Sequence, residues 1–241
     1  MKKQILFGLH TVKAALANPR RHHKALYLTV KTQHLIKELS RELPPVKIVS
    51  LKELEQKVPP QSVHQQIVLE TSAIPSLSIE ELCDSSTEEE TLVILDQVTD
   101  PHNVGAILRS CAALNAKALI LTSNHSSSMD STVLAKTASG ALEVIPVIEV
   151  TNLAATLDFL KEKGFWCYGL DESGSSVLGQ VKLEGKVAFV MGAEGKGLRR
   201  LTKEKCDDLI RLPTNPHFST LNVSNALAIV LFEKHTQSMR D

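Results

Sequence analysis

Several features that define other protein classes are scarce or absent in this sequence. The 241 residues include only four cysteines, which are far apart and form no Cys-x-x-Cys pair. A disulfide framework or a zinc site is therefore not expected, and a reducing cytoplasm is the predicted compartment. No apolar run approaches the roughly 18 to 20 residues that a membrane helix needs. The N-terminus also lacks the apolar stretch of a signal peptide, so we expect no membrane attachment and no metal ion.

Net charge is also absent, because 27 Lys and Arg balance 27 Asp and Glu. The balance hides an asymmetry: residues 1–72 carry twelve basic and five acidic side chains, a net charge of +7. Residues 73–90 carry six acids and no base, and residues 91–241 carry fifteen bases and sixteen acids. An excess of positive charge over a whole small domain favours a polyanion as partner.

Glycine is missing from a long part of the chain, since Gly8 is followed by no other glycine until Gly105. Together with the charges, this change of composition predicts two domains, at 1–72 and 91–241, joined by an acidic linker at 73–90. Hydrophobic residues make up 43% of the chain, which is enough for each domain to bury a core.

The first domain has the pattern of a small α/β unit. Helices are predicted at 10–17, 32–43 and 51–57, and strands at 25–30, 46–49 and 66–69. Only two aromatic residues, Phe7 and Tyr27, occur before residue 73, both in apolar contexts typical of a core. We therefore expect this domain to bind RNA through charge, with its densest basic cluster at residues 20–24.

The second domain alternates apolar strands with amphipathic helices. Strands are predicted at 92–95, 118–121, 144–147, 165–170, 187–191 and 209–212, and helices at 104–114, 130–138, 153–163 and 221–235. This order predicts an α/β fold with a mostly parallel sheet covered on both faces. Ligands of such sheets bind outside the carboxyl ends of the strands, so the loops that follow the strands are the candidate sites.

The first of these loops precedes the helix at 104–114. Asp100 or Asn103 could cap the helix, or could present polar groups at the sheet edge. Arg109 lies between Leu108 and Cys111 on an otherwise apolar helix. We expect its guanidinium to be buried and to need an anionic partner, either a phosphate or a structural carboxylate.

The second loop contains Gly192, Glu194, Gly195 and Gly197. This spacing is neither the dinucleotide pattern Gly-x-Gly-x-x-Gly nor a phosphate-binding loop that ends in Gly-Lys-Ser/Thr. A tight strand-to-helix turn would account for the glycines, but Glu194 is unusual in a turn of small residues.

The third loop runs from Leu212 into the helix at 221–235, and it is rich in Asn, Ser and Thr. Ser219 or Thr220 could cap the helix, and Asn222 and Ser224 could be ordinary first-turn residues. The number of polar side chains instead favours contacts with bases and sugars.

Taken in order, these loops resemble the three motifs of the SpoU (TrmH-type) methyltransferases of the SPOUT class. Asn103 and Arg109 match the first motif, the turn with Glu194 matches the second, and residues 221–226 match the third. Residues 136–141 and 150–153 also resemble the family. Residues 7–16 resemble the start of the RNA-binding domain of one subgroup, which methylates the ribose of a guanosine in 23S ribosomal RNA.

The resemblance implies a C-terminal trefoil knot and methyl transfer from S-adenosylmethionine to a ribose 2′-hydroxyl. It implies that Gly192, Leu212 and Leu221 bind the cofactor. It also implies catalytic roles for four residues, of which Arg109 handles the ribose hydroxyl or an adjoining phosphate: Arg109, Asn103, Glu194 and Asn222. Members of the family dimerise near the knot, and the apolar residues 227–232 of the last predicted helix fit a homodimer.

Two alternatives stay open on the sequence. One is a transfer-RNA ribose methyltransferase, and the other is an RNA-binding protein with an inactive catalytic domain. A dehydrogenase or a kinase would need the nucleotide motifs that are missing here. Residues 214–218 lack the glycine that the family often has in this stretch, which leaves the substrate details of that loop open.

Overall fold

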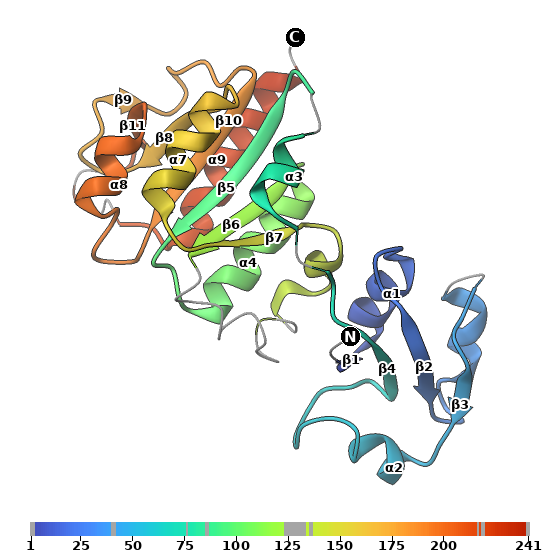
Figure 1. The fold of residues 1–241 in the computed structure, drawn as a ribbon. Helices are drawn as coiled ribbons and strands as arrows, with labels where there is room; N and C mark the ends of the chain where they lie inside the picture. Colours follow the sequence, from blue (N-terminus) through green and yellow to red (C-terminus); the bar gives the residue numbers. More distant parts are fainter. Residues whose placement is uncertain are drawn as a thin grey trace. The chain divides into compact units, whose positions relative to one another are not determined.

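The computed structural model describes residues 3–39, 42–75, 77–84, 87–122, 134, 137–215, 217 and 220–239. The chain forms two compact units, which Figure 1 colours along the sequence. Unit 1 consists of Met1–Ser76 together with Ser139–Val144, and unit 2 consists of Leu77–Ala138 together with Ile145–Asp241. A short segment from the second half of the sequence is therefore part of the N-terminal unit.

Unit 1 contains a four-stranded sheet with the order β1-β4-β2-β3. Its strands are β1 Lys3–Phe7, β2 His23–Leu28, β3 Val46–Ile48 and β4 Ile67–Ser72. Its helices are α1 Leu9–Ala17, α2 Leu51–Glu55 and the 3-10 helices η1 Gln33–Glu38 and η3 Ala141–Glu143. β4 is antiparallel to both neighbours, while β3 runs parallel to β2.

Both faces of this sheet are covered by apolar side chains. One cluster joins α1 and η1 to the sheet through residues such as Val12, Leu26 and Leu69. The other cluster joins α2 to the opposite face and includes Tyr27, which is buried as expected. The predicted helix at 32–43 was wrong in kind, since only the 3-10 helix η1 forms there, and β1 was not predicted.

Unit 2 contains a seven-stranded sheet with the order β7-β6-β5-β10-β8-β11-β9. Its strands are β5 Glu90–Asp96, β6 Ala118–Thr122, β7 Val147–Val150, β8 Trp166–Leu170, β9 Ser176–Val177, β10 Lys186–Gly192 and β11 Asp208–Arg211. Every neighbouring pair is parallel, so the predicted parallel sheet is confirmed.

Helices cover both faces of the parallel sheet (Figure 1). They are α3 Ile79–Cys83, α4 Pro101–Ala113, α7 Leu153–Glu162, α8 Arg200–Lys205 and α9 Val223–Ser238. Leu82 of α3 and Leu157 of α7 pack with Leu92 and Ile94 on one face. Because side chains alternate along a strand, Val93 and Leu95 point to the other face, where α4 and α9 pack against each other.

Several elements differ from the sequence prediction. The strand predicted at 144–147 begins only at Val147, because residues 141–143 form η3 in unit 1. The predicted linker contains α3, which starts with a capping box between Ser78 and Glu81. β9 and α8 were not predicted, and most of the helix predicted at 130–138 lies outside the described residues. Within the described part of the chain, no helix has the length and apolar character to span a membrane.

Candidate active site

The carboxyl ends of the central strands of unit 2 carry the polar residues of the candidate site. β5 ends at Asp96 and β10 ends at Gly192, and these two residues are partners in the sheet register. The loop after β5 leads into α4, whose N-cap is Asp100: its Oδ1 accepts a hydrogen bond from the backbone N–H of His102 at 2.9 Å. Since Asp100 caps the helix, the side chain of Asn103 is available for another role.

Three side chains from the three predicted loops form one hydrogen-bonded network. Asn103 Nδ2 donates to Glu194 Oε1 at 3.2 Å, and Asn222 Nδ2 donates to the same oxygen at 2.6 Å. Asn222 Nδ2 also donates to Asn103 Oδ1 at 3.0 Å. Asn103 is 91 positions from Glu194 and 119 positions from Asn222 in the sequence. The fold therefore brings distant residues to one point.

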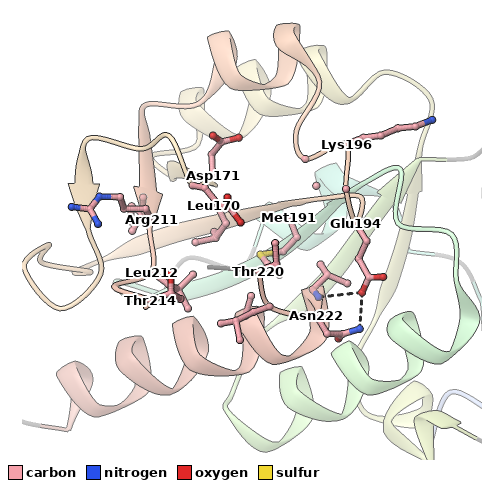
Figure 2. A pocket seen from close by; sticks show the side chains of 18 residues that line it. Leu170, Asp171, Met191, Glu194, Lys196, Arg211, Leu212, Thr214, Thr220 and Asn222 are labelled. Carbon is pink, nitrogen blue, oxygen red and sulfur yellow. Dashed lines mark hydrogen bonds between the residues drawn. The ribbon is translucent and has the colours of Figure 1, made fainter. Parts of the chain in front are cut away.

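The carboxylate of Glu194 is held through one of its two oxygens. The backbone N–H of Val223 also points to Oε1, at 3.5 Å, and Figure 2 shows this contact beside that of Asn222. Among the described residues, Oε2 has no hydrogen-bond partner, and the Glu194 residue is exposed. One face of an anchored carboxylate is therefore open to a ligand.

Asn222 has two roles at the start of α9. It is the N-cap, because its Oδ1 accepts from the backbone N–H and from the hydroxyl of Ser224, at 2.9 and 2.5 Å. Its amide Nδ2 is then directed to Glu194 and Asn103. The sequence offered Ser219 or Thr220 as the cap and Asn222 as an ordinary first-turn residue, but the N-cap is Asn222. One orientation of its side chain serves both the cap and the network.

The glycines of the second loop build a tight turn between β10 and α8. A Cβ at Gly192 would lie 2.2 Å from the carbonyl carbon of Gly197, so no other residue fits at this position. Gly197 itself has φ of 64°, a left-handed conformation that favours glycine. The missing side chain of Gly192 therefore allows a close approach to the backbone of its own turn.

An ion pair between the buried Asp96 and the half-exposed Arg199 fixes the far end of the same turn. Asp96 is fully buried and accepts hydrogen bonds from the backbone N–H of Arg199 at 3.1 Å and from its Nε at 2.6 Å. Sequence reasoning missed this residue. Its position as the acidic last residue of an otherwise apolar strand was the signal that could have identified it.

A cavity of about 1020 Å³ opens next to the network (Figure 2). Gly192, Leu212 and Leu221, which the sequence analysis selected together, all line this cavity, as do Glu194 and Asn222. Its other apolar lining residues are Leu170, Met191, Ile210, Val223 and Ala226. The lining also contains polar and charged residues: Asp171, Glu172, Lys196, Arg211, Thr214 and Thr220. A cavity that combines apolar walls with placed polar groups is the usual form of a small-molecule site.

Asp171 is a further carboxylate of the cavity that sequence reasoning missed. It follows β8, and its Oδ2 lies 2.6 Å from Lys203 Nζ. Burial alone would raise the pKa of Asp171, but hydrogen bonds from Lys203 and Ser173 outweigh it and hold the pKa below its ordinary value. This side chain is therefore a carboxylate at neutral pH.

Arg109 is not where the sequence analysis expected its guanidinium. The residue is exposed, and no described residue forms a hydrogen bond or ion pair with it. The buried residues of α4 are Val104, Gly105, Ile107, Leu108 and Cys111. Since 3.6 residues make one turn, position 109 faces away from this stripe. The expectation of a buried Arg109 was therefore wrong, and Arg109 does not line the cavity.

The described residues contain no group of three or more His, Cys, Asp or Glu side chains that could hold a metal ion. The chemistry that these residues offer is that of the anchored Glu194 carboxylate, two amides, the Asp171 carboxylate and a cavity with apolar and polar walls.

Comparison with protein families gives two matches that together span most of the chain. Residues 90–232 match the model of the SpoU rRNA Methylase family. Residues 5–76 match the model described as RNA 2′-O ribose methyltransferase substrate binding. The first match contains the three loops of the candidate site, and the second falls within the N-terminal part of unit 1.

Individual proteins are similar over nearly their whole length. The chain is 39% identical to a Vibrio parahaemolyticus protein named 23S rRNA (guanosine-2′-O-)-methyltransferase RlmB, with 99% of each chain covered. It is 40% identical to the Pseudomonas aeruginosa protein of the same name, covering 95% of this chain and 94% of the relative. The crystal structure of the SpoU methyltransferase AviRb from Streptomyces viridochromogenes, in complex with AdoMet, has the same fold. It shares 19% identity, with a TM-score of 0.81 over 98% of this chain and 91% of that one.

Proposed function

Because the chain belongs to the SpoU rRNA methylase family, we propose that it transfers a methyl group from S-adenosylmethionine to the ribose 2′-hydroxyl of a guanosine in 23S ribosomal RNA. The observation that carries this proposal is the convergence of all three motifs on one cavity, through Asn103, Glu194 and Asn222. The full-length similarity to proteins named for this reaction supports the choice of substrate.

The cavity suits the size and chemistry of S-adenosylmethionine. Its volume of about 1020 Å³ is in the range of small-molecule sites. Leu212 and Leu221 offer an apolar wall for the adenine, and the turn from Gly192 offers backbone groups for the polar parts. The carboxylate of Asp171 at the cavity suits a cationic amino group. When bound, the cofactor supplies a methyl group that its sulfonium activates.

The network then positions the ribose. Glu194 is oriented by Asn103 and Asn222, so its free Oε2 can accept a hydrogen bond from a ribose hydroxyl. A fixed acceptor of this kind holds the attacking oxygen in line for transfer. Because the two asparagines come from different loops, a change in either loop would disturb the position of the carboxylate.

Arg109 is assigned to the RNA rather than to the cavity. A guanidinium is effectively never deprotonated in proteins, so it cannot serve as the base. Exposed and without a partner among the described residues, it is available to bind a phosphate next to the reacting ribose. That phosphate can accept the hydroxyl proton while Arg109 stabilises the charge that develops.

Two further parts of the proposal concern assembly and location. We place the protein in the cytoplasm, where ribosomal RNA is made, and assign residues 1–72 to RNA binding and 91–241 to catalysis. The trefoil knot implied by the resemblance belongs to the same proposal.

α9 leaves Ile229 and Phe232 exposed by 44% and 58%, and we assign this apolar strip to a second copy of the chain. Light scattering of Phe232→Glu against the unmodified protein tests the dimer.

The decisive experiment maps 2′-O-methylation on total RNA from a strain that lacks this protein. The expected result is the loss of one methylated guanosine in 23S ribosomal RNA, restored by the wild-type gene. Loss of a transfer-RNA methylation instead would favour the tRNA enzyme. No change in any methylation, with RNA binding retained, would favour an inactive RNA-binding protein.

A further inference from the structure

Residues 136–141 resemble the family in sequence, but the segment 137–144 that contains most of them has no role in the function proposed above. Its first two described residues pack in unit 2, against α4. A Cβ at Gly105 would lie 2.6 Å from Thr137 Cβ and 3.0 Å from the backbone nitrogen of Ala138. Gly105 is two positions after Asn103, in the first turns of α4. The segment therefore supports the part of α4 that carries a residue of the network.

The following residues of the segment pack in unit 1, against α1. Gly140 has φ of 92°, and a Cβ there would lie 2.8 Å from Ala14 Cβ. Gly140 is also the N-cap of η3, which ends at Glu143. The segment thus has one end in each unit, with the chain passing from one to the other between Ala138 and Ser139.

Glu143 is bound in unit 1 by an ion pair that excludes water. Arg21 Nε lies 2.6 Å from Oε2 and Arg21 Nη2 lies 2.6 Å from Oε1, a bidentate geometry, and each side chain is only 3% exposed. Asn18 Nδ2 adds a hydrogen bond to Oε2 at 3.0 Å. The remaining nitrogen of Arg21, Nη1, donates to Gln4 Oε1 and to the carbonyl oxygen of Ser72.

This pairing changes the interpretation of the basic cluster at residues 20–24. Arg21 was expected there as a cation for RNA, but its charge is neutralised and inaccessible. Removing one partner of a buried pair is costly because the other charge is left uncompensated. The pair therefore fixes Glu143, and with it the end of the segment, far more firmly than a surface ion pair would.

We propose that Arg21 and Glu143 are positioning residues for methyl transfer. They anchor the segment in unit 1, and the anchored segment holds Thr137 and Ala138 against Gly105, so that Asn103 stays in register with Glu194. The inference rests on the proposed function, and it assigns to two residues of the RNA-binding unit an effect on the chemical step. A purely structural pair would instead affect only the stability of unit 1 and its binding of RNA.

The test is Glu143→Gln, which keeps the shape of the side chain and removes its charge. At saturating RNA and S-adenosylmethionine we expect kcat to fall by about 2- to 30-fold, the range of couplings carried by packed networks. KM for RNA should stay within about twofold, because Arg21 and Glu143 are both buried and present no charge to RNA. Kd for the cofactor should also stay within about twofold, because the cavity is lined by unit 2 alone. Hydrogen exchange should increase at residues 139–144 and in the first turns of α4.

Glu90→Gln is the matched control. Glu90 is an equally buried carboxylate, 2.7 Å from Lys117 Nζ, but it lies at the start of β5, away from the network. We expect its loss to lower the melting temperature and to leave kcat unchanged within twofold. Assays are run where melting curves show each variant to be folded.

Arg21→Lys is the second variant, which tests the inference if Glu143→Gln does not fold. It keeps the charge but cannot make the bidentate contact, so a smaller fall in kcat is expected. A kcat equal to that of the wild type in the folded variants, or a rise in KM for RNA alone, would overturn the inference. The absence of methyl transfer by the unmodified protein would contradict the proposed function instead.

Discussion

The two units of this protein differ in how they bury and pair their charged side chains. In unit 1, Arg21 and Glu143 are buried together and saturate each other with hydrogen bonds. In unit 2, Glu194 is exposed, is held through one oxygen, and keeps the other free. A charge that is buried and fully paired stabilises a fold, whereas a charge that is anchored but only partly paired can act on a ligand.

The sheets of the two units explain this difference. The sheet of unit 1 is mostly antiparallel, so the loops that follow its strands are divided between two edges. The sheet of unit 2 is parallel throughout, which brings the loops after β5, β8, β10 and β11 to one edge. All four of these segments and the N-terminus of α9 line the cavity or form the network. A parallel sheet therefore brings the side chains of several loops to one edge, which is where ligands of open α/β sheets bind.

The largest effect is expected from removing the free carboxylate of unit 2. Glu194→Gln keeps the size of the side chain but weakens the acceptor and its hold by Asn103 and Asn222. We expect kcat to fall by about 10²- to 10³-fold, the cost of losing one preorganised group, with cofactor affinity nearly unchanged. Single-turnover methyl transfer with labelled S-adenosylmethionine measures it. Glu184→Gln, an exposed carboxylate near β10, is the control, and equal losses in both variants would refute the assignment.

A similar loss of activity with no loss of stability is expected from Arg109→Ala. Because Arg109 is exposed, the melting temperature should change little, within about 0.5 kcal/mol of stability. Arg109→Lys should also be inactive, since an ammonium cannot make a planar bidentate contact to a phosphate. The pair of measurements is the melting temperature and the transfer rate on the same protein. An early-melting variant that regains activity in the cold would identify Arg109 as structural.

The sequence predicted the parallel strands and the loops of the candidate site better than it predicted burial. Continuous apolar runs such as residues 92–95 identified the parallel strands, since such runs suit a sheet that is covered on both faces. Arg21 was expected to be accessible but is buried, whereas Arg109 was expected to be buried but is exposed. Arg21 owes its burial to Glu143, 122 positions away, and no local pattern reports a partner at that distance. The direction of Arg109 depended on which stripe of α4 faces α9.

A smaller effect, dependent on salt, is expected from two cations of unit 1, the exposed Lys24 and the partly buried Arg20. Arg20→Gln with Lys24→Gln should weaken RNA binding several-fold at low salt and lower the slope of log affinity against log salt by about two, one for each charge. Cofactor binding should not change. Titration of labelled RNA at several salt concentrations measures this, with Lys182→Gln of unit 2 as the control. An unchanged slope would show that the positive charge of unit 1 does not contact RNA.

The smallest effect is a loss of stability at alkaline pH, and the thiols that contribute to it lie in unit 2, which contains all four cysteines. Burial raises the pKa of Cys111, of Cys167 and of Cys206 to about 12. A thiol whose pKa is raised on folding stabilises the protein fully below its unfolded pKa, and this contribution is lost as the pH rises toward the folded value. Each of the three should therefore cost about 1.4 kcal/mol by pH 10. Urea unfolding at pH 8 and pH 10 measures the loss, and Cys111→Ser is unsuitable as a control because it buries a hydroxyl. Cys167→Ala should instead lower stability at both pH values but reduce the difference between them by about one third, because Cys111 and Cys206 still contribute. A thiol reagent at pH 8 should label Cys83, which is only half-buried, before Cys111 or Cys167, and rapid labelling of those two would show that the core of unit 2 opens more readily than this structure implies.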